Sequence, residues 1–235
     1  PTNCNTVVDG VDYFDNNPDD SGEYVGIWSD FEIDTYGGTD ATADNHRPVI
    51  AYYDTTNKRL KVARGNSAQP SGTGGWTIQA VPNTGFIGQY VSMAIDGSGN
   101  LHIAAFKNST GDLIYIYAAN VNGTSSYTFS TPVVVDAEGS VGAWCDIELI
   151  DGSPVISYLN STSIGTFDGL KYAYVTGAPT SAANWEHMII PADASVADKR
   201  TSVAVAKNNA AWNGRIAFAF GSTNYEIVYQ VEEVQ

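Results

Sequence analysis

Short apolar segments recur along this chain at a steady spacing, and the recurrence predicts the architecture. The four clearest copies are residues 48–54, 101–106, 154–159 and 215–220. Each follows a first apolar segment, such as residues 29–34 or 91–96, and precedes a third one, such as residues 60–64 or 170–175. Fourth strands are expected at residues 76–81, 127–135 and 185–190. A strand-only repeat of about 50 to 60 residues is typical of a β-propeller. We therefore predict an all-β fold, namely a four-bladed β-propeller that forms a single domain over residues 1–235.

The repeat also predicts how the ring is completed. The blades are expected at about residues 26–82, 88–136, 142–191 and 198–235, and the last one ends before a fourth strand. Residues 5–10 resemble residues 131–136, which belong to a fourth strand. We therefore expect the N-terminal strand to complete the last blade and to cover its open edge. A ring of five shorter blades is the alternative, although only four copies of each strand can be found.

Composition narrows the class of protein. The chain is 43% hydrophobic and has 11 basic against 26 acidic residues, a net charge of −15. This charge argues against a nucleic-acid partner, because phosphate binding needs clustered Lys and Arg. No apolar run reaches the roughly 18 residues of a membrane helix, so no membrane insertion is expected. The acidic balance, with few Lys and much Asn, Gly, Ser and Thr, favours a secreted or cell-surface protein, or a periplasmic one.

Two segments carry a family resemblance. Residues 90–106 read YVSMAIDGSGNLHIAAF, and residues 110–115 read TGDLIY. They resemble the repeats of secreted bacterial β-propeller proteins, and the similarity extends over residues 26–230. The resemblance implies the architecture and a secreted, bacterial, adhesive or scaffolding setting, but it implies no particular activity.

The first strands of the predicted blades differ from one another in their polar residues, and these differences indicate where a functional site could lie. Blades one and three place carboxylates at Asp30, Glu32, Asp146 and Glu148, where the other two have Ser92, Ala94, Ser202 and Ala204. Residues that alternate along a strand share one face, so each acidic pair points the same way. Four converging carboxylates predict a bound cation, and an all-oxygen set suits Ca²⁺. The alternatives are hydrogen bonds to backbone amides and Ser hydroxyls of neighbouring blades, or a catalytic pair.

Just before those carboxylates, three aromatic residues share one aligned position. They are Trp28, Tyr90 and Trp144, and Arg200 takes the fourth position. Three aromatic rings and a guanidinium around one channel mouth are suited to a glycan or a protein ligand. Packing between blades is the alternative interpretation.

These features favour a non-catalytic extracellular interaction or adhesion module, which could form part of a larger assembly. The alternatives are a glycan-processing hydrolase that uses carboxylates at the channel mouth, and a purely structural domain. Glycoside cleavage would need an acid and a base or nucleophile roughly 5 to 9.5 Å apart. No short catalytic motif occurs, and Cys145 is expected to be a buried free thiol.

Overall fold

The computed structural model describes residues 8–9, 24–35, 46–121, 126–160, 169–190, 201–205, 215–221 and 227–233. Within these ranges the regular elements are strands, apart from two short 3-10 turns at Thr73–Gly75 and Ala182–Asn184. The all-β prediction is confirmed for this part of the chain. No helix in it is long and apolar enough to cross a membrane.

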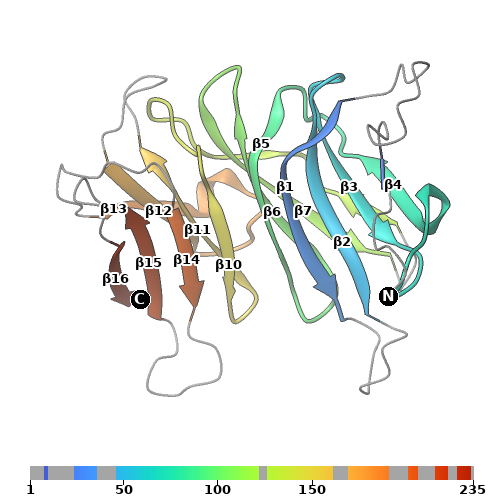
Figure 1. The fold of residues 1–235 in the computed structure, drawn as a ribbon. Coiled ribbons are helices and arrows are strands. Elements are labelled where there is room, and N and C mark those ends of the chain that lie inside the picture. Colours follow the sequence, from blue (N-terminus) through green and yellow to red (C-terminus); the bar gives the residue numbers. More distant parts are fainter. Residues whose placement is uncertain are drawn as a thin grey trace.

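The strands form four antiparallel sheets whose internal order follows the chain (Figure 1). The first sheet is β1 (Val25–Asp34), β2 (Arg47–Asp54), β3 (Arg59–Gly65) and β4 (Trp76–Ala80). In the second, β5 (Ile87–Ile95), β6 (Leu101–Lys107) and β7 (Asp112–Asn120) are followed by β8 (Tyr127–Phe129) and β9 (Val133–Asp136), which both pair with β7. The third is β10 (Asp146–Ile150), β11 (Ser153–Asn160), β12 (Gly169–Val175) and β13 (Trp185–Ile190). The fourth has three described strands, β14 (Thr201–Val205), β15 (Arg215–Gly221) and β16 (Ile227–Glu233).

Local chemistry explains why consecutive strands pair as hairpins. In the turn between β5 and β6, the Asp96 carboxylate accepts hydrogen bonds from the backbone N–H groups of Ser98 and Asn100. Gly99 follows with φ 77°, a left-handed conformation that glycine adopts without steric cost. The turn is thus fixed by residues within it, and the register of the hairpin follows.

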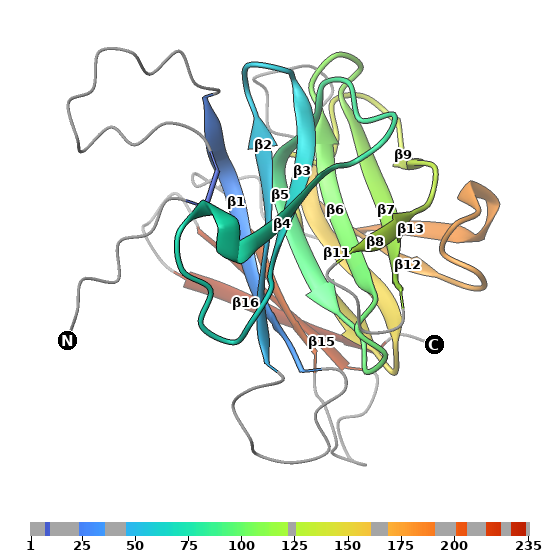
Figure 2. The same ribbon diagram turned by 90° about the vertical axis from the view of Figure 1, so that its right-hand side faces the viewer.

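Successive sheets lie next to each other, and Figure 2 shows β5 of the second sheet beside β1 and β2 of the first. β1 lies against β5, β5 against β10, and β10 against β14. The core fills the spaces between sheets: Met93, Ile103 and Ile116 belong to a buried cluster between the first and second sheets. Tyr115 and Tyr158 belong to the next cluster, between the second and third. Face-to-face packing of apolar sheet surfaces therefore holds the molecule together.

Two strand predictions need correction. β1 and β5 begin several residues earlier than the predicted segments, because the bulged stretches that precede the apolar alternation still pair with the second strands. The predicted fourth strand at residues 127–135 is divided into β8 and β9. Pro132 lies in the break, and it has no N–H group to donate to a strand ladder.

Part of the N-terminal segment is described. The Asp9 carboxylate accepts hydrogen bonds from the Tyr52 hydroxyl, at 2.7 Å, and from Lys61 Nζ, at 3.0 Å. These contacts attach the segment to the first sheet, and the rest of the predicted closing strand lies outside the described residues. β1 and β14, the outer members of the row of first strands, make no extensive contact with each other.

Candidate functional site

The predicted aromatic residues share an uncommon backbone conformation. Trp28, Tyr90 and Trp144 have φ values of 51°, 52° and 53°. The pairing register shifts around Trp28 in β1 and around Tyr90 in β5, which marks β-bulges. A left-handed conformation is costly for a bulky side chain, and three aligned aromatic residues adopt it here. Such repeated strain points to a function for the orientation of the rings.

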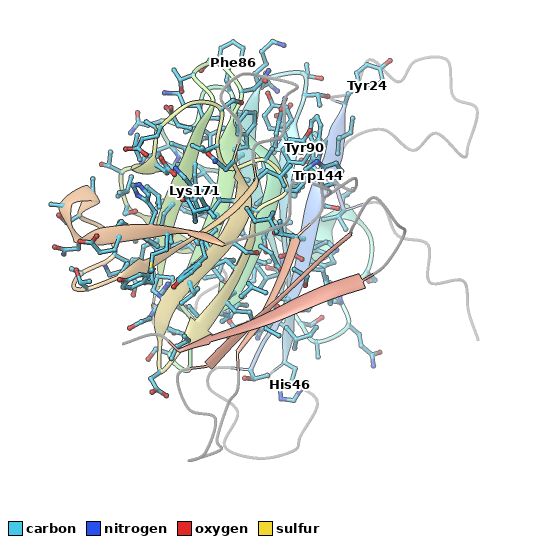
Figure 3. All side chains as sticks on the ribbon, turned by 90° about the vertical axis from the view of Figure 1, so that its left-hand side faces the viewer. Tyr24, His46, Phe86, Tyr90, Trp144 and Lys171 are labelled. Carbon is cyan, nitrogen blue, oxygen red and sulfur yellow. The ribbon has the colours of Figure 1, made fainter. Side chains whose placement is uncertain are left out.

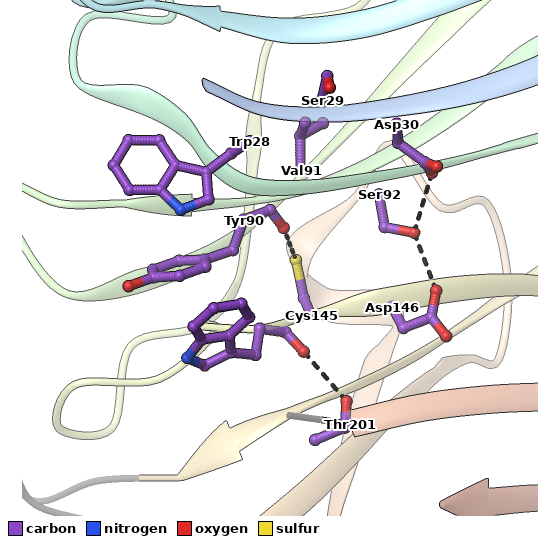
Figure 4. A pocket seen from close by; sticks show the side chains of 10 residues that line it. Trp28, Ser29, Asp30, Tyr90, Val91, Ser92, Cys145, Asp146 and Thr201 are labelled. Carbon is purple, nitrogen blue, oxygen red and sulfur yellow. Dashed lines mark hydrogen bonds between the residues drawn. The ribbon is translucent and has the colours of Figure 1, made fainter. Parts of the chain in front are cut away.

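The three rings form a continuous row, which we call the aromatic mouth (Figure 4). The ring centroids of Trp28 and Tyr90 are 5.4 Å apart, and those of Tyr90 and Trp144 are 4.7 Å apart. Residues of the second strands support the row from behind: Tyr53 contacts Trp28, and Phe106 contacts Tyr90. All three rings of the mouth are half-buried. Figure 3 shows Tyr90 and Trp144 next to each other, toward the end of the sheets that carries Phe86.

The mouth lines a recess of about 400 Å³. The remaining lining residues come from the first strands of all four sheets, or directly precede β10 in the case of Cys145, and are Ser29, Asp30, Val91, Ser92, Cys145, Asp146 and Thr201. The Thr201 hydroxyl donates a hydrogen bond to the Trp144 carbonyl at 3.0 Å. Arg200, the fourth predicted member of the mouth, lies outside the described residues. The recess therefore combines flat apolar surfaces with hydroxyl and carboxylate groups.

Asp30 connects the first sheet to the second. Its Oδ2 accepts hydrogen bonds from the Met93 backbone N–H, at 2.7 Å, and from the Ser92 hydroxyl, at 3.3 Å. Its Oδ1 accepts one from the Phe31 N–H, at 2.8 Å. Both oxygens of this carboxylate are therefore occupied by donors of the protein.

Asp146 repeats this arrangement between the third and fourth sheets. Its Oδ2 accepts hydrogen bonds from the Val203 N–H, at 2.8 Å, and from the Ser202 hydroxyl, at 3.0 Å. Its Oδ1 lies 3.0 Å from Ser92 Oγ, which itself accepts a hydrogen bond from the Ile147 N–H at 3.2 Å. Asp30, Ser92, Asp146 and Ser202 thus form a row that we call the carboxylate–serine chain, and Figure 4 shows its first three members. Ser92 has one hydroxyl proton, so it can donate to only one of its two carboxylate neighbours at a time.

Electrostatics distinguishes the first of the two aspartates. Burial raises the pKa of Asp30, and the negative charge of Asp146 raises it further. Hydrogen bonds from Met93, Phe31 and Ser92 act in the opposite direction without cancelling the shift. The protonated form of Asp30 is therefore more accessible than that of an ordinary aspartate.

The other two predicted ligands lie apart from this arrangement. Glu32 is exposed and Glu148 is half-buried. Among the described residues, three possible ligand atoms come within 4.8 Å of one another only at Asp136, Glu138 and His187. There Lys171 Nζ already lies 3.0 Å from Asp136 and 3.4 Å from Glu138, so a cation of the protein balances these acids. The Ca²⁺ prediction for the four channel carboxylates stays a prediction.

Two features of the site were not predicted from the sequence. The mouth residues are neither glycine nor Asn, so their left-handed conformation was not expected, although a glycine with positive φ stands two residues before each of them, at Gly26, Gly88 and Gly142. Cys145 is buried as expected, and its thiol donates a hydrogen bond to the Tyr90 carbonyl at 2.9 Å. Burial, together with the nearby Asp146 and Asp30, raises the pKa of this thiol, which keeps it protonated and unreactive. The thiol thus fixes the backbone of the mouth.

No protein-family model and no curated protein matches the chain. Solved structures with some likeness include an α-L-arabinofuranosidase from Lactobacillus brevis, at 11% identity and a TM-score of 0.47, with 92% of this chain and 75% of that chain covered. A GH43 β-1,3-galactosidase has 10% identity and a TM-score of 0.48, with 79% and 40% covered. A fucose-specific lectin from Aleuria aurantia has 13% identity and a TM-score of 0.42, with 80% and 56% covered. This chain thus spans less than two thirds of the galactosidase and lectin chains, and likenesses at these TM-scores carry no argument about activity.

Proposed function

We propose that the aromatic mouth is the ligand site of a non-catalytic binding module, and that its ligand is a carbohydrate. The observation that carries this proposal is the strained left-handed conformation, which recurs at Trp28, Tyr90 and Trp144. Inter-sheet packing alone does not require it, since any residue can pack in an unstrained strand conformation. The left-handed conformation orients the three rings toward one recess, as is expected of a binding surface.

The chemistry of the recess favours a neutral sugar. Aromatic faces stack against the C–H faces of a pyranose or furanose ring, while hydroxyl groups such as that of Thr201 bond to the sugar's hydroxyls. The described lining contains two aspartates and no basic side chain, and the whole chain carries a net charge of −15. An anionic ligand would therefore be repelled.

The proposal is tested by removing the rings one at a time. A glycan array followed by calorimetry identifies and quantifies a neutral oligosaccharide ligand. Trp28→Ala and Trp144→Ala are each expected to weaken its binding about tenfold, which corresponds to ~1.4 kcal/mol. Phe86→Ala removes an aromatic ring that is 44% exposed outside the recess and serves as the matched control. Undiminished binding by both Trp variants, or an equal loss in the control, would reject the mouth as the site.

One observation favours glycoside hydrolysis as a second candidate. Asp30, with its raised pKa, and Asp146 lie on either side of the Ser92 hydroxyl in the recess. Two neighbouring carboxyl groups, one of which has a raised pKa, resemble the acid and base pair of glycosidases, whose two groups are roughly 5 to 9.5 Å apart. Against this, the oxygens of both aspartates already accept hydrogen bonds that join neighbouring sheets.

The two candidates differ in a direct measurement. A hydrolase releases reducing sugar from its glycan, and Asp30→Asn abolishes the release while binding persists. A binding module releases none with either form of the protein. The wider setting that we propose, a secreted or cell-surface module that serves adhesion and has a cation among its channel carboxylates, rests on the sequence alone.

A further inference from the structure

Two of the three mouth residues are held by a hydrogen bond from the sheet that follows theirs. The Cys145 thiol donates to the Tyr90 carbonyl at 2.9 Å, and the Thr201 hydroxyl donates to the Trp144 carbonyl at 3.0 Å (Figure 4). The Thr201 hydroxyl also lies 2.8 Å from Ser157 Oγ, and it accepts from that group because its own proton is given to Trp144. Each bond fixes the backbone of a mouth residue to a side chain of the next sheet.

The two donors occupy equivalent positions of the repeat, and Val91 occupies the third. The residue two positions after each of them donates its backbone N–H to the carboxylate–serine chain. These donors are Met93 to Asp30, Ile147 to Ser92, and Val203 to Asp146. Val91, Cys145 and Thr201 therefore face the same point of three successive sheet junctions.

Val91 differs from the other two in its chemistry and not in its placement. It lines the same recess, and it is 7% exposed, as Cys145 is. Valine and threonine have nearly the same shape, but the valine side chain has only methyl groups and cannot donate a hydrogen bond. The Trp28 carbonyl thus receives no hydrogen bond from the side chain at this position.

The spacing of the rings shows the same difference. Tyr90 and Trp144, whose carbonyls accept these bonds, have centroids 4.7 Å apart. The centroids of Trp28 and Tyr90 are 5.4 Å apart, so the first ring packs less closely on the row. Trp28 nevertheless has the same left-handed backbone, with φ 51°. Since a net hydrogen bond is worth about as much as this strain, its loss shifts the population toward an unstrained conformation about fivefold.

We propose that Trp28 is the adjustable ring of the aromatic mouth and determines its specificity, while Tyr90 and Trp144 form a fixed platform. This inference rests on the proposed function, the binding of a carbohydrate at the mouth. In the free protein Trp28 exchanges between the left-handed conformation and an extended one, and a stacked sugar ring selects the first. Val91 and Thr201 are positioning residues, because they act on the ligand only through the rings whose backbone they hold or release.

An exchange of donor and methyl group between the two positions tests the proposal in the free protein. Val91→Thr gives Trp28 the missing hydroxyl, and Thr201→Val removes the existing one from Trp144. Relaxation dispersion of the indole 15N signals detects exchange between conformers on the millisecond scale. We expect exchange at Trp28 and none at Trp144 in the wild type, about fivefold less exchange of Trp28 in Val91→Thr, and new exchange of Trp144 in Thr201→Val. The buried Trp185, at 7% exposed, serves as the reference signal in every variant.

A second variant keeps the test decisive if the threonine disturbs folding. Val91→Cys introduces the donor that residue 145 already uses, and it should also reduce the exchange of Trp28. Equal exchange at Trp28 and Trp144 in the wild type would overturn the proposal. Unchanged exchange of Trp28 in both Val91 variants would overturn it as well, because residue 91 then does not control the ring.

Calorimetry with the carbohydrate ligands of a glycan array gives the second readout. Thr201→Val is expected to weaken the best ligand about fivefold, because binding must then also order Trp144. Val91→Thr should strengthen the best ligand about fivefold and weaken ligands that fit the extended conformation of Trp28, so that selectivity rises. An equal loss of affinity for all ligands in Val91→Thr would overturn the role in specificity. If no carbohydrate binds the wild type, the proposed function fails, whereas the relaxation data still decide whether Trp28 is the adjustable ring.

Discussion

At the scale of single residues, the backbone of the aromatic mouth is the most informative feature. Trp28, Tyr90 and Trp144 each adopt a conformation that a bulky L-residue avoids, at a cost of roughly 1 to 2 kcal/mol apiece. Packing has to supply that energy, and the contacts with Tyr53, Phe106 and the neighbouring rings of the row do so. The fixed arrangement of the three rings therefore costs some stability.

This strain leads to a prediction about which replacement is tolerated. Trp144→Gly and Trp144→Ala both remove the ring, but only glycine adopts φ 53° without steric cost. Trp144→Gly is therefore expected to be more stable than Trp144→Ala by about 1 kcal/mol, the reverse of the usual order in a strand. Urea unfolding of the two variants measures the difference. Trp185→Gly and Trp185→Ala, at the start of β13, give the control in an ordinary extended conformation. A more stable Ala variant at residue 144 would mean that the strain is absent in solution.

At the scale of elements, the first strands provide most residues of the candidate site. The sequence predicted part of their arrangement. The alternation in residues 146–150 correctly predicts that Asp146 and Glu148 share one face. It could not show that the Asp146 carboxylate would be filled by donors from β14, since Val203 N–H and Ser202 Oγ come from more than 50 residues away. The bulges at Trp28 and Tyr90 were also not predicted, because an aromatic residue does not itself indicate a left-handed conformation; the local signal is the glycine two residues earlier, Gly26 or Gly88, which also has a positive φ.

The junction between β9 and the third sheet gives a prediction about pH. Burial alone would raise the pKa of Asp136, but hydrogen bonds from the Glu138 N–H, Lys171 and Tyr158 outweigh it and lower the pKa below its ordinary value. A carboxyl whose pKa is lower in the folded state stabilises that state above the unfolded pKa of about 3.9, and the stabilisation is lost as pH falls below it. Asp136→Asn should therefore cost about 3 kcal/mol at pH 7, where it leaves the buried Lys171 ammonium with only the exposed carboxylate of Glu138, and this cost should decrease as pH falls below about 3.9.

That pH dependence is measured by urea unfolding of the wild type and of Asp136→Asn between pH 3 and pH 7. Asp151→Asn, in the exposed turn after β10, is the control and is expected to leave the free energy of unfolding within ~0.5 kcal/mol of wild type throughout. A deficit for Asp136→Asn that stays constant with pH would show that the charge of Asp136 contributes nothing.

At the scale of the whole molecule, four sheets in chain order follow from the repeated second strands, because every hairpin connects sequence neighbours. Whether the row of sheets closes on itself does not follow in the same way. Closure depends on the angle between successive sheets, and that angle is set by packing among residues such as Met93, Ile147 and Val203 rather than by any one segment. Four or five blades are compatible with the same local pattern, so the number in a closed ring stays a prediction.

Deletion of residues 1–10 tests closure at this scale. The deletion removes Asp9, which leaves Tyr52 and Lys61 without that carboxylate, although Lys61 keeps Asp54 at 3.3 Å. If Asp9 acts alone, the deletion and Asp9→Ala should lower Tm equally. If the segment also forms the outermost strand beside β16, the deletion additionally exposes a sheet edge, and its Tm should be lower by several degrees than that of Asp9→Ala. We expect the second result, since Asp9 reproduces the contacts of Asp136, which ends a strand paired with β7. A truncated protein with the Tm of the wild type would contradict both the Asp9 contacts and the closing strand.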